Sequence, residues 1–147
     1  MHCLIRKRTV CRTPEEEVRQ GILFAMLNRL NYPEQLIAVE KSLSSLPHSQ
    51  SLPLPDRRID IVVFTPHREE GLAPLMLIEC KAHAPKPDVF LQLMGYNRFI
   101  QAPWIAVAAL ESIQAGYLQG QQWTFRSGLP EYQEALIKIS SPLMTRG

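Results

Sequence analysis

The chain has 147 residues, of which 46% are hydrophobic and 20% charged, with a formal net charge of +2 at pH 7. This length suits one domain with a sizeable core, and the composition is that of a globular protein, which excludes a disordered or fibrous chain. The small net charge neither requires nor excludes a nucleic-acid partner, because a local basic stripe can outweigh the sum. Every apolar run is too short to cross a bilayer, so we expect no membrane partner.

The cysteines and the N-terminus indicate where the protein works. Cys3, Cys11 and Cys80 are odd in number and form no Cys-x-x-Cys motif, so neither a zinc site nor a disulfide framework is expected. A reducing cytoplasm is therefore the favoured location. Basic residues follow the short apolar pair after Met1 and do not precede it, which is not the pattern of a signal peptide.

Three segments are expected along the chain: a basic N-terminal arm over residues 1–12, a single domain over 13–140 and a loose tail over 141–147. The arm can contact phosphate or simply be solvated; its basic residues are Arg6, Lys7, Arg8 and Arg12.

The domain begins with a predicted helix. Thr13 suits the N-cap, Pro14 suits the first helical position, and the glutamates that follow favour the positive end of the helix dipole. Glu16 stands where it would complete a Thr-x-x-Glu capping box. An apolar stripe of helical period then runs as far as Leu30, and Asn31 with Pro33 ends the helix.

Five strands are predicted from short runs rich in Ile, Val, Leu and aromatic residues: 36–43, 58–64, 75–82, 104–109 and 122–126. The first of these could also continue as helix. The Ser- and Pro-rich segment 44–55 is expected to be a loop. Further helices are predicted over 88–100, with Asp88 as the N-cap, and over 129–139.

Two connections define the expected topology. The turn-rich residues 65–71 should join strands 58–64 and 75–82 as a hairpin. The helix between strands 75–82 and 104–109 makes a βαβ crossover, which implies that these two strands are parallel. The predicted fold is therefore an α/β (α+β) arrangement, a mixed β-sheet flanked by helices in the order α-β-β-β-α-β-β-α.

The strand over 75–82 ends in an acid and a base. Because side chains alternate along a strand, Glu79 and Lys81 share one face, and Cys80 points away as a small core residue. A charge pair here is either a structural ion pair or a site, since burying either charge alone costs several kcal/mol. The hairpin would bring Asp60 beside it. Two carboxylates, a backbone carbonyl and open water positions suit Mg²⁺ or Mn²⁺ better than zinc.

These residues carry a resemblance to a known family. Asp60, followed nineteen positions later by Glu79-Cys80-Lys81, resembles the PD-(D/E)xK signature of the restriction-endonuclease-like nucleases. Gln92 and Tyr96 form a Gln-x-x-x-Tyr pair on the next predicted helix, as in the RecB-type branch. Four blocks in order, spread over roughly residues 13–135, are similar to the nuclease domain at the N-terminus of type I restriction enzyme R subunits: Thr-Pro-Glu-Glu-Glu-Val-Arg-Gln, Pro-Asp-Arg-Arg-Ile-Asp-Ile-Val-Val, Ile-Glu-Cys-Lys-Ala and Gln-Leu-Met-Gly-Tyr-Asn-Arg-Phe.

The resemblance implies a role for each residue of the signature. Asp60 and Glu79 would bind Mg²⁺ or Mn²⁺, with the backbone carbonyl of Cys80 as a third ligand. Lys81 would be the catalytic lysine, and Gln92 would help to position the substrate or that lysine.

The resemblance also implies supporting residues. Tyr96 would either support the site or pack in the core. An acid on the first helix often joins the site in this family; Glu16 is the first choice and Glu15 the second. Four basic residues near element ends could contact the DNA backbone or be ordinary surface charges, namely Arg57, Arg58, Lys86 and Arg98.

The implied function is a Mg²⁺-dependent deoxyribonuclease that hydrolyses DNA phosphodiesters, alone or with other restriction or repair subunits. Complete R subunits carry a DNA translocase motor after this domain, but the printed residues contain no Gly-rich Walker loop, so we expect no ATP-driven translocation by this chain. The alternative is a catalytically silent member of the fold that binds nucleic acid or protein.

Overall fold

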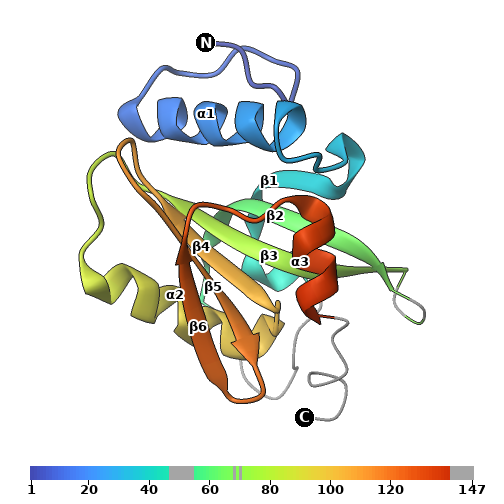
Figure 1. The fold of residues 1–147 in the computed structure, drawn as a ribbon. Coiled ribbons are helices and arrows are strands. Elements are labelled where there is room, and N and C mark those ends of the chain that lie inside the picture. The colour runs from blue at the N-terminus through green and yellow to red at the C-terminus, as the bar shows by residue number, and fades with distance from the viewer. Residues whose placement is uncertain (47–54, 68, 70, 140–147) are drawn as a thin grey trace.

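The computed structural model describes residues 1–46, 55–67, 69 and 71–139, which are coloured in Figure 1. The predicted tail 141–147 and most of the predicted loop 44–55 lie outside these residues. The described elements are α1 (Pro14–Asn28), η1 (Glu34–Leu36), β1 (Ile37–Ser42), η2 (Leu43–Ser45), β2 (Arg58–His67), β3 (Gly71–Cys80), α2 (Pro87–Ile100), β4 (Trp104–Ala108), β5 (Ile113–Gln119), β6 (Gln122–Ser127) and α3 (Tyr132–Ile139). None of these helices is long and apolar enough to span a membrane.

The strands form one mixed sheet in the spatial order β1-β2-β3-β4-β5-β6. Neighbours pair antiparallel except β3 and β4, which are parallel because α2 connects them as a crossover. The hairpin between β2 and β3 and the parallel crossover were both predicted, and the structure confirms them. The predicted fold class is likewise confirmed.

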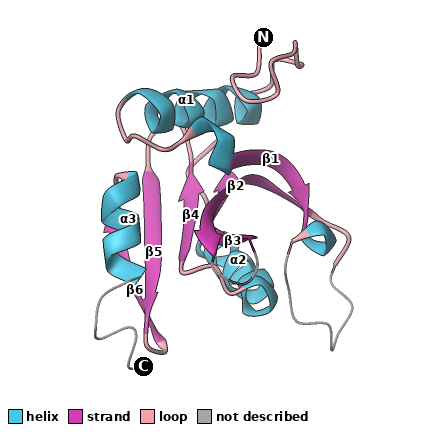
Figure 2. Ribbon diagram, turned by 90° about the vertical axis from the view of Figure 1, so that its right-hand side faces the viewer, coloured by secondary structure: helices cyan, strands magenta, loops and turns pink. Residues whose placement is uncertain are grey.

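Helices cover both faces of this sheet (Figures 1 and 2). On one face, α1 and α3 enclose an apolar cluster that includes Leu23, Ile78 and Trp104. The indole Nε1 of Trp104 donates to the carbonyl of Ala135 at 3.2 Å, which fixes α3 to this face. On the other face, α2 packs through Leu93 onto a second cluster. Because both faces are covered, a central strand can be apolar throughout, and Leu75 to Ile78 of β3 are 0% exposed.

One strand is absent from the prediction. Residues Ile113–Gln119 form β5, which pairs with β4 on one side and β6 on the other, so the sheet has six strands where five were expected. The segment contains two Gln, an Ala and a Gly, residue types that strands do not favour. Its position between two paired strands outweighs that weak local preference.

Several element boundaries also differ from the prediction. The N-cap residue of α2 is Lys86, whose side chain makes no capping hydrogen bond, and Pro87 is the first helical residue. Asp88 therefore lies in the first turn of the helix and is not the N-cap. Proline suits the first helical position because its missing N–H would be unpaired there. Strand β3 begins at Gly71 and ends at Cys80, which leaves Lys81 just beyond the strand.

Candidate active site

Asp60 and Glu79 meet where the β2–β3 ladder ends. The last paired residues are Ile61 and Ile78, so Asp60 and Glu79 come next on the two strands. The backbone N–H of Cys80 donates to Asp60 Oδ2 at 2.7 Å, which holds the Asp60 carboxylate against the residue that follows Glu79. Glu79 itself is 5% exposed. The strand geometry thus gathers two carboxylates at one end of β3.

The two carboxylates raise each other's cost of ionisation. Burial raises the pKa of Glu79, and the charge of Asp60 raises it further, to about 7. Burial likewise raises the pKa of Asp60, although the Cys80 N–H and the positive charge of Arg19 oppose the shift. Two adjacent acids with raised pKa values, one buried and one half-buried, are typical of a functional site, because a purely structural position gains nothing from this repulsion.

Arg57 is the direct partner of Glu79. Its Nη2 lies 3.4 Å from Glu79 Oε2, and its guanidinium carbon lies 5.2 Å from the centroid of the Tyr96 ring. The second carboxylate oxygen, Oε1, is buried and has no hydrogen-bond partner among the described residues. A buried carboxylate oxygen without a partner is costly in a metal-free protein, and it is the donor that a hard cation would use.

Lys81 follows directly on the strand that carries Glu79. Its backbone N–H donates to the carbonyl of Ala108 at 2.8 Å, which ties it to the end of β4. The side chain is half-buried. Its positive charge lowers the pKa of both Asp60 and Glu79, so the ammonium group lies within electrostatic reach of both carboxylates.

The two residues of the Gln-x-x-x-Tyr pair differ in their exposure to solvent. Tyr96 is half-buried and packs against the apolar cluster under α2, while the guanidinium of Arg57 lies over its ring. Tyr96 therefore both packs and supports a residue of the site. Gln92, one turn earlier on α2, is exposed.

Comparison with known proteins gives this arrangement a family. Residues 14–125 match the family model described as the type I restriction enzyme R protein N terminus (HSDR_N). The chain belongs to this family. A search of curated proteins found no match. Among solved structures, the chain is similar to a fragment described as the HsdR subunit of a type I restriction enzyme from Vibrio vulnificus YJ016, with 13% identity and a TM-score of 0.46. That match covers 85% of this chain and 23% of the fragment.

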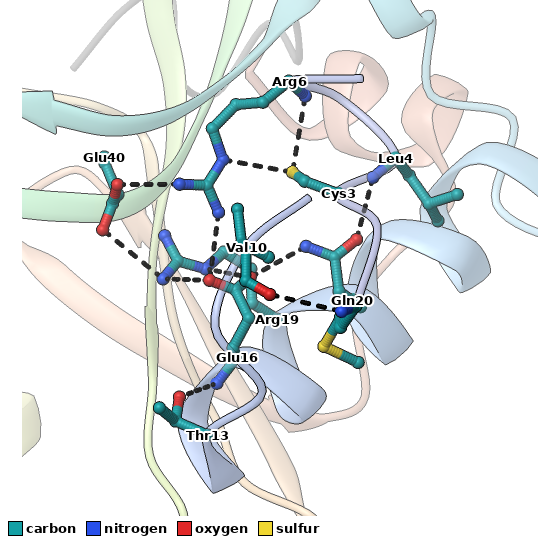
Figure 3. A network of polar contacts seen from close by, with 10 residues as sticks. Cys3, Leu4, Arg6, Val10, Thr13, Glu16, Arg19, Gln20 and Glu40 are labelled. Carbon is teal, nitrogen blue, oxygen red and sulfur yellow. Dashed lines mark hydrogen bonds and ion pairs between the residues drawn. The ribbon is translucent and has the colours of Figure 1, made fainter. Parts of the chain in front are cut away.

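In this R-protein N-terminal domain, Glu16 lies in a network of arginines (Figure 3). Its backbone N–H donates to Thr13 Oγ1 at 3.0 Å, the expected N-cap. Its carboxylate turns to other partners: Arg6 Nη2 lies 3.0 Å from Oε1, and Gln20 Nε2 donates to Oε2 at 2.8 Å. Burial would raise the pKa of Glu16, but Gln20, Arg19 and Arg6 together lower it.

The two candidate acids of α1 therefore lie in different surroundings. The carboxylate oxygens of Glu16 are both occupied by partners from α1 and the N-terminal arm. Glu15 is exposed, and its charge is one of those that raise the pKa of Asp60. Glu15, the second choice from the sequence, is thus free of the ion pairs that hold Glu16, and its charge contributes to the raised pKa of Asp60.

Arg19 was not predicted as a site residue, although its charge acts from α1 on Asp60. The residue is 7% exposed and binds Glu16 and, at 3.6 Å, Glu40 of β1. Its charge also lowers the pKa of Asp60. The spacing of three residues between Glu16 and Arg19 on a helix could have indicated the ion pair. No signal in the sequence indicated that Arg6 of the N-terminal arm would form ion pairs with both Glu16 and Glu40.

The predicted DNA-contacting residues are not gathered in one place. Arg58 and Lys86 are exposed at the starts of β2 and α2. Arg98 is exposed near the end of α2, where it lines a hollow with Leu118 and Trp123. The start of α2 follows the end of β3 that carries Glu79, so Arg98 lies toward the opposite end of the sheet.

The donor set fits a hard divalent ion only if backbone or water oxygens join it. Within the described part of the chain, no three His, Cys, Asp or Glu side chains come together as a metal cluster. Asp60 and Glu79 supply two carboxylates, and Cys80, which follows Glu79 directly, donates its backbone N–H to Asp60. Mg²⁺ is often held by one or two carboxylates with several waters retained, so the two carboxylates of Asp60 and Glu79 fit the ligand set of this ion.

Proposed function

We propose that this domain is a metal-dependent DNA nuclease that hydrolyses phosphodiester bonds in the cytoplasm. The observation that carries the proposal is the pair of half-buried Asp60 and buried Glu79, with the positive charge of Lys81 acting on both. Within the described part of the chain, Glu79 Oε1 has no hydrogen-bond partner. Membership of the type I restriction enzyme R protein N-terminal family supports it. DNA is the proposed substrate, and other restriction or repair subunits are the proposed partners.

Each residue of the site has a defined task in this proposal. Asp60, Glu79 and the Cys80 carbonyl would hold Mg²⁺ or Mn²⁺. Such an ion, when bound, supplies Lewis acidity toward the phosphate and toward water. Lys81 donates hydrogen bonds to a phosphate oxygen and balances the negative charge that develops on the pentavalent phosphorus. Gln92, exposed on α2, contacts the substrate.

A plasmid-nicking assay tests the proposal. The wild-type protein is incubated with supercoiled plasmid and Mg²⁺ or Mn²⁺, beside Asp60→Asn, Lys81→Met and the control Asp56→Asn. Asp56 is exposed four residues before Asp60, so its variant removes the same charge outside the site. We expect metal-dependent nicking by the wild type and Asp56→Asn, and a loss of at least about 100-fold in the other two.

The assay also separates the alternative function. Folded wild-type protein that cuts no form of DNA with either metal, yet retards DNA in a gel, would support a silent DNA-binding module. Nicking that persists in Lys81→Met and Asp60→Asn would place the chemistry elsewhere and overturn the assignment of the site.

A further inference from the structure

Arg57 is held in place by contacts with three parts of the fold. Its carbonyl accepts a hydrogen bond from the backbone N–H of Leu43 at 2.9 Å, which fixes its backbone beside η2. Its side chain lies between Glu79, 3.4 Å from Nη2, and the ring of Tyr96, 5.2 Å from the guanidinium carbon. The guanidinium thus lies between a buried carboxylate of β3 and an aromatic face of α2.

Arg57 supplies a positive charge beside the two carboxylates. Two adjacent carboxylates in a poorly hydrated position are stabilised by a counter-charge or by a bound proton. Among the described residues, Arg57 is the cation that forms an ion pair with Glu79. Its charge lowers the pKa of Glu79 more than the charge of Lys81 does. In the metal-free protein, Arg57 therefore does part of what a bound divalent ion would do.

The contact between Arg57 and Glu79 is incomplete. At 3.4 Å it is longer than the pairs that Arg6 makes with Glu16 at 3.0 Å and with Glu40 at 2.9 Å. It uses one donor and one oxygen, where a strong arginine–carboxylate pair uses two of each. Arg57 Nε and Glu79 Oε1 are both buried and have no hydrogen-bond partner among residues 1–46, 55–67, 69 and 71–139. Such a pair is easier to separate than a bidentate one.

We infer that Arg57 takes the place of a metal cation beside Glu79: it competes with a divalent metal ion for this carboxylate and, when the metal binds, leaves Glu79 but keeps its contact with the Tyr96 ring. The inference rests on the proposed function, since it concerns the same site. It assigns Arg57 as a positioning residue that sets metal affinity through Glu79. It also gives a role to the aromatic ring beside the guanidinium: the ring already contacts the cation and continues to stabilise it once the carboxylate is taken by the metal.

Metal binding to the whole chain tests this inference without relying on cleavage. Mn²⁺ alone is titrated by isothermal calorimetry into the wild type, Arg57→Gln, Arg57→Lys, Arg58→Gln and Glu79→Gln. Arg58→Gln is the matched control, because it removes the same charge from the next residue, which is exposed. We expect Arg57→Gln to bind Mn²⁺ about tenfold more tightly than Arg58→Gln, and Arg57→Lys to lie between wild type and Arg57→Gln.

The outcomes distinguish the inference from the proposed function. If Mn²⁺ binds through Glu79 but Arg57→Gln binds no more tightly than Arg58→Gln, the role of Arg57 is overturned and the metal site stands. If the wild type binds no Mn²⁺, or Glu79→Gln binds it equally well, the metal site itself is overturned. Should Arg57→Gln fail to fold, Arg57→Lys decides: an affinity at or below that of the wild type contradicts the inference.

Discussion

Glu79 and Glu16 are both buried glutamates, yet their surroundings shift their pKa values in opposite directions. Burial and the charge of Asp60 raise the pKa of Glu79 to about 7. Burial also acts on Glu16, but a hydrogen bond from Gln20 and the charges of two arginines outweigh it, and the pKa falls. A raised pKa means that the folded protein holds the proton more tightly than the unfolded chain, and a lowered pKa means the reverse.

These shifts predict opposite pH dependences of stability in EDTA. The contribution of Glu79 is fully present below its usual pKa of 4.5 and is lost as the pH rises to about 7. Glu79→Gln should therefore unfold at a higher temperature than the wild type at pH 8, by about 5 °C, with little difference at pH 4. Thermal unfolding followed by circular dichroism measures this.

Glu16→Gln is the comparison for that experiment. The stabilising contribution of Glu16 is present above its usual pKa of 4.5 and is lost as the pH falls through its lowered value. Its substitution should lower stability at pH 8 by roughly 3 kcal/mol, because Arg6 and Arg19 lose a buried partner. A stability gain in Glu16→Gln, or a loss in Glu79→Gln, at pH 8 would contradict these pKa directions.

The sequence could predict which residues of the site approach one another but not how they are paired. The alternation of β3 and the hairpin turn place Asp60 opposite Glu79 whatever the side chains do. The ion pair of Arg57 with Glu79 depends on the direction of one flexible side chain at a strand start, which no periodicity encodes. The pair of Arg6 and Glu16 depends on a turn in the arm, where Cys3 Sγ accepts hydrogen bonds from Arg6.

In β5, packing against neighbouring strands outweighs the low strand propensity of the sequence. Gly116 of β5 lies under the ring of Phe125 on β6, and a Cβ built at Gly116 would lie 3.0 Å from two atoms of that ring. The same ring makes an edge contact with Phe90 of α2 at 5.2 Å between centroids. A residue type that weakens an isolated strand thus allows β6 and α2 to approach.

Gly116→Ala should therefore destabilise the protein, because the added methyl group must displace the Phe125 ring. The expected loss is about 1 kcal/mol in the free energy of unfolding, measured by urea denaturation. Gly21→Ala in α1 is the matched control. A Cβ there has no atom within 4 Å, so alanine should stabilise the helix by roughly 0.5–1 kcal/mol. Equal effects of the two substitutions would show that contact with Phe125 is unimportant.

Elements with strong local signals were the predictable ones. Thr13 with Pro14 fixed the start of α1, and the apolar run of β3 was long enough to identify a buried strand. The start of α2 was misplaced because Lys86 and Asp88 both flank a proline, and only the backbone decides which of them is the cap.

The centre of the sheet should be the part of the protein that is most resistant to local unfolding. β3 and β4 have neighbouring strands on both sides and helices over both faces. In native-state hydrogen exchange, their amides should exchange only through global unfolding, whereas amides of β6, at the sheet edge, should exchange at least about tenfold faster. Amides of β6 as protected as those of β4 would contradict this order.

The spatial order of the strands equals their order along the chain. As a result, the residues that would bind metal and phosphate, together with Arg57 and Tyr96, are encoded in one continuous stretch that comprises a hairpin and the helix after it; only the charges of Glu15 and Arg19 reach Asp60 from α1. The site can thus be assembled before β5 and β6 are synthesised, from contacts that are close in sequence. Sequence changes in β5, β6 and α3 therefore leave intact the segment that carries the proposed chemistry, whereas β4 must be kept because it pairs with β3 and holds the backbone of Lys81.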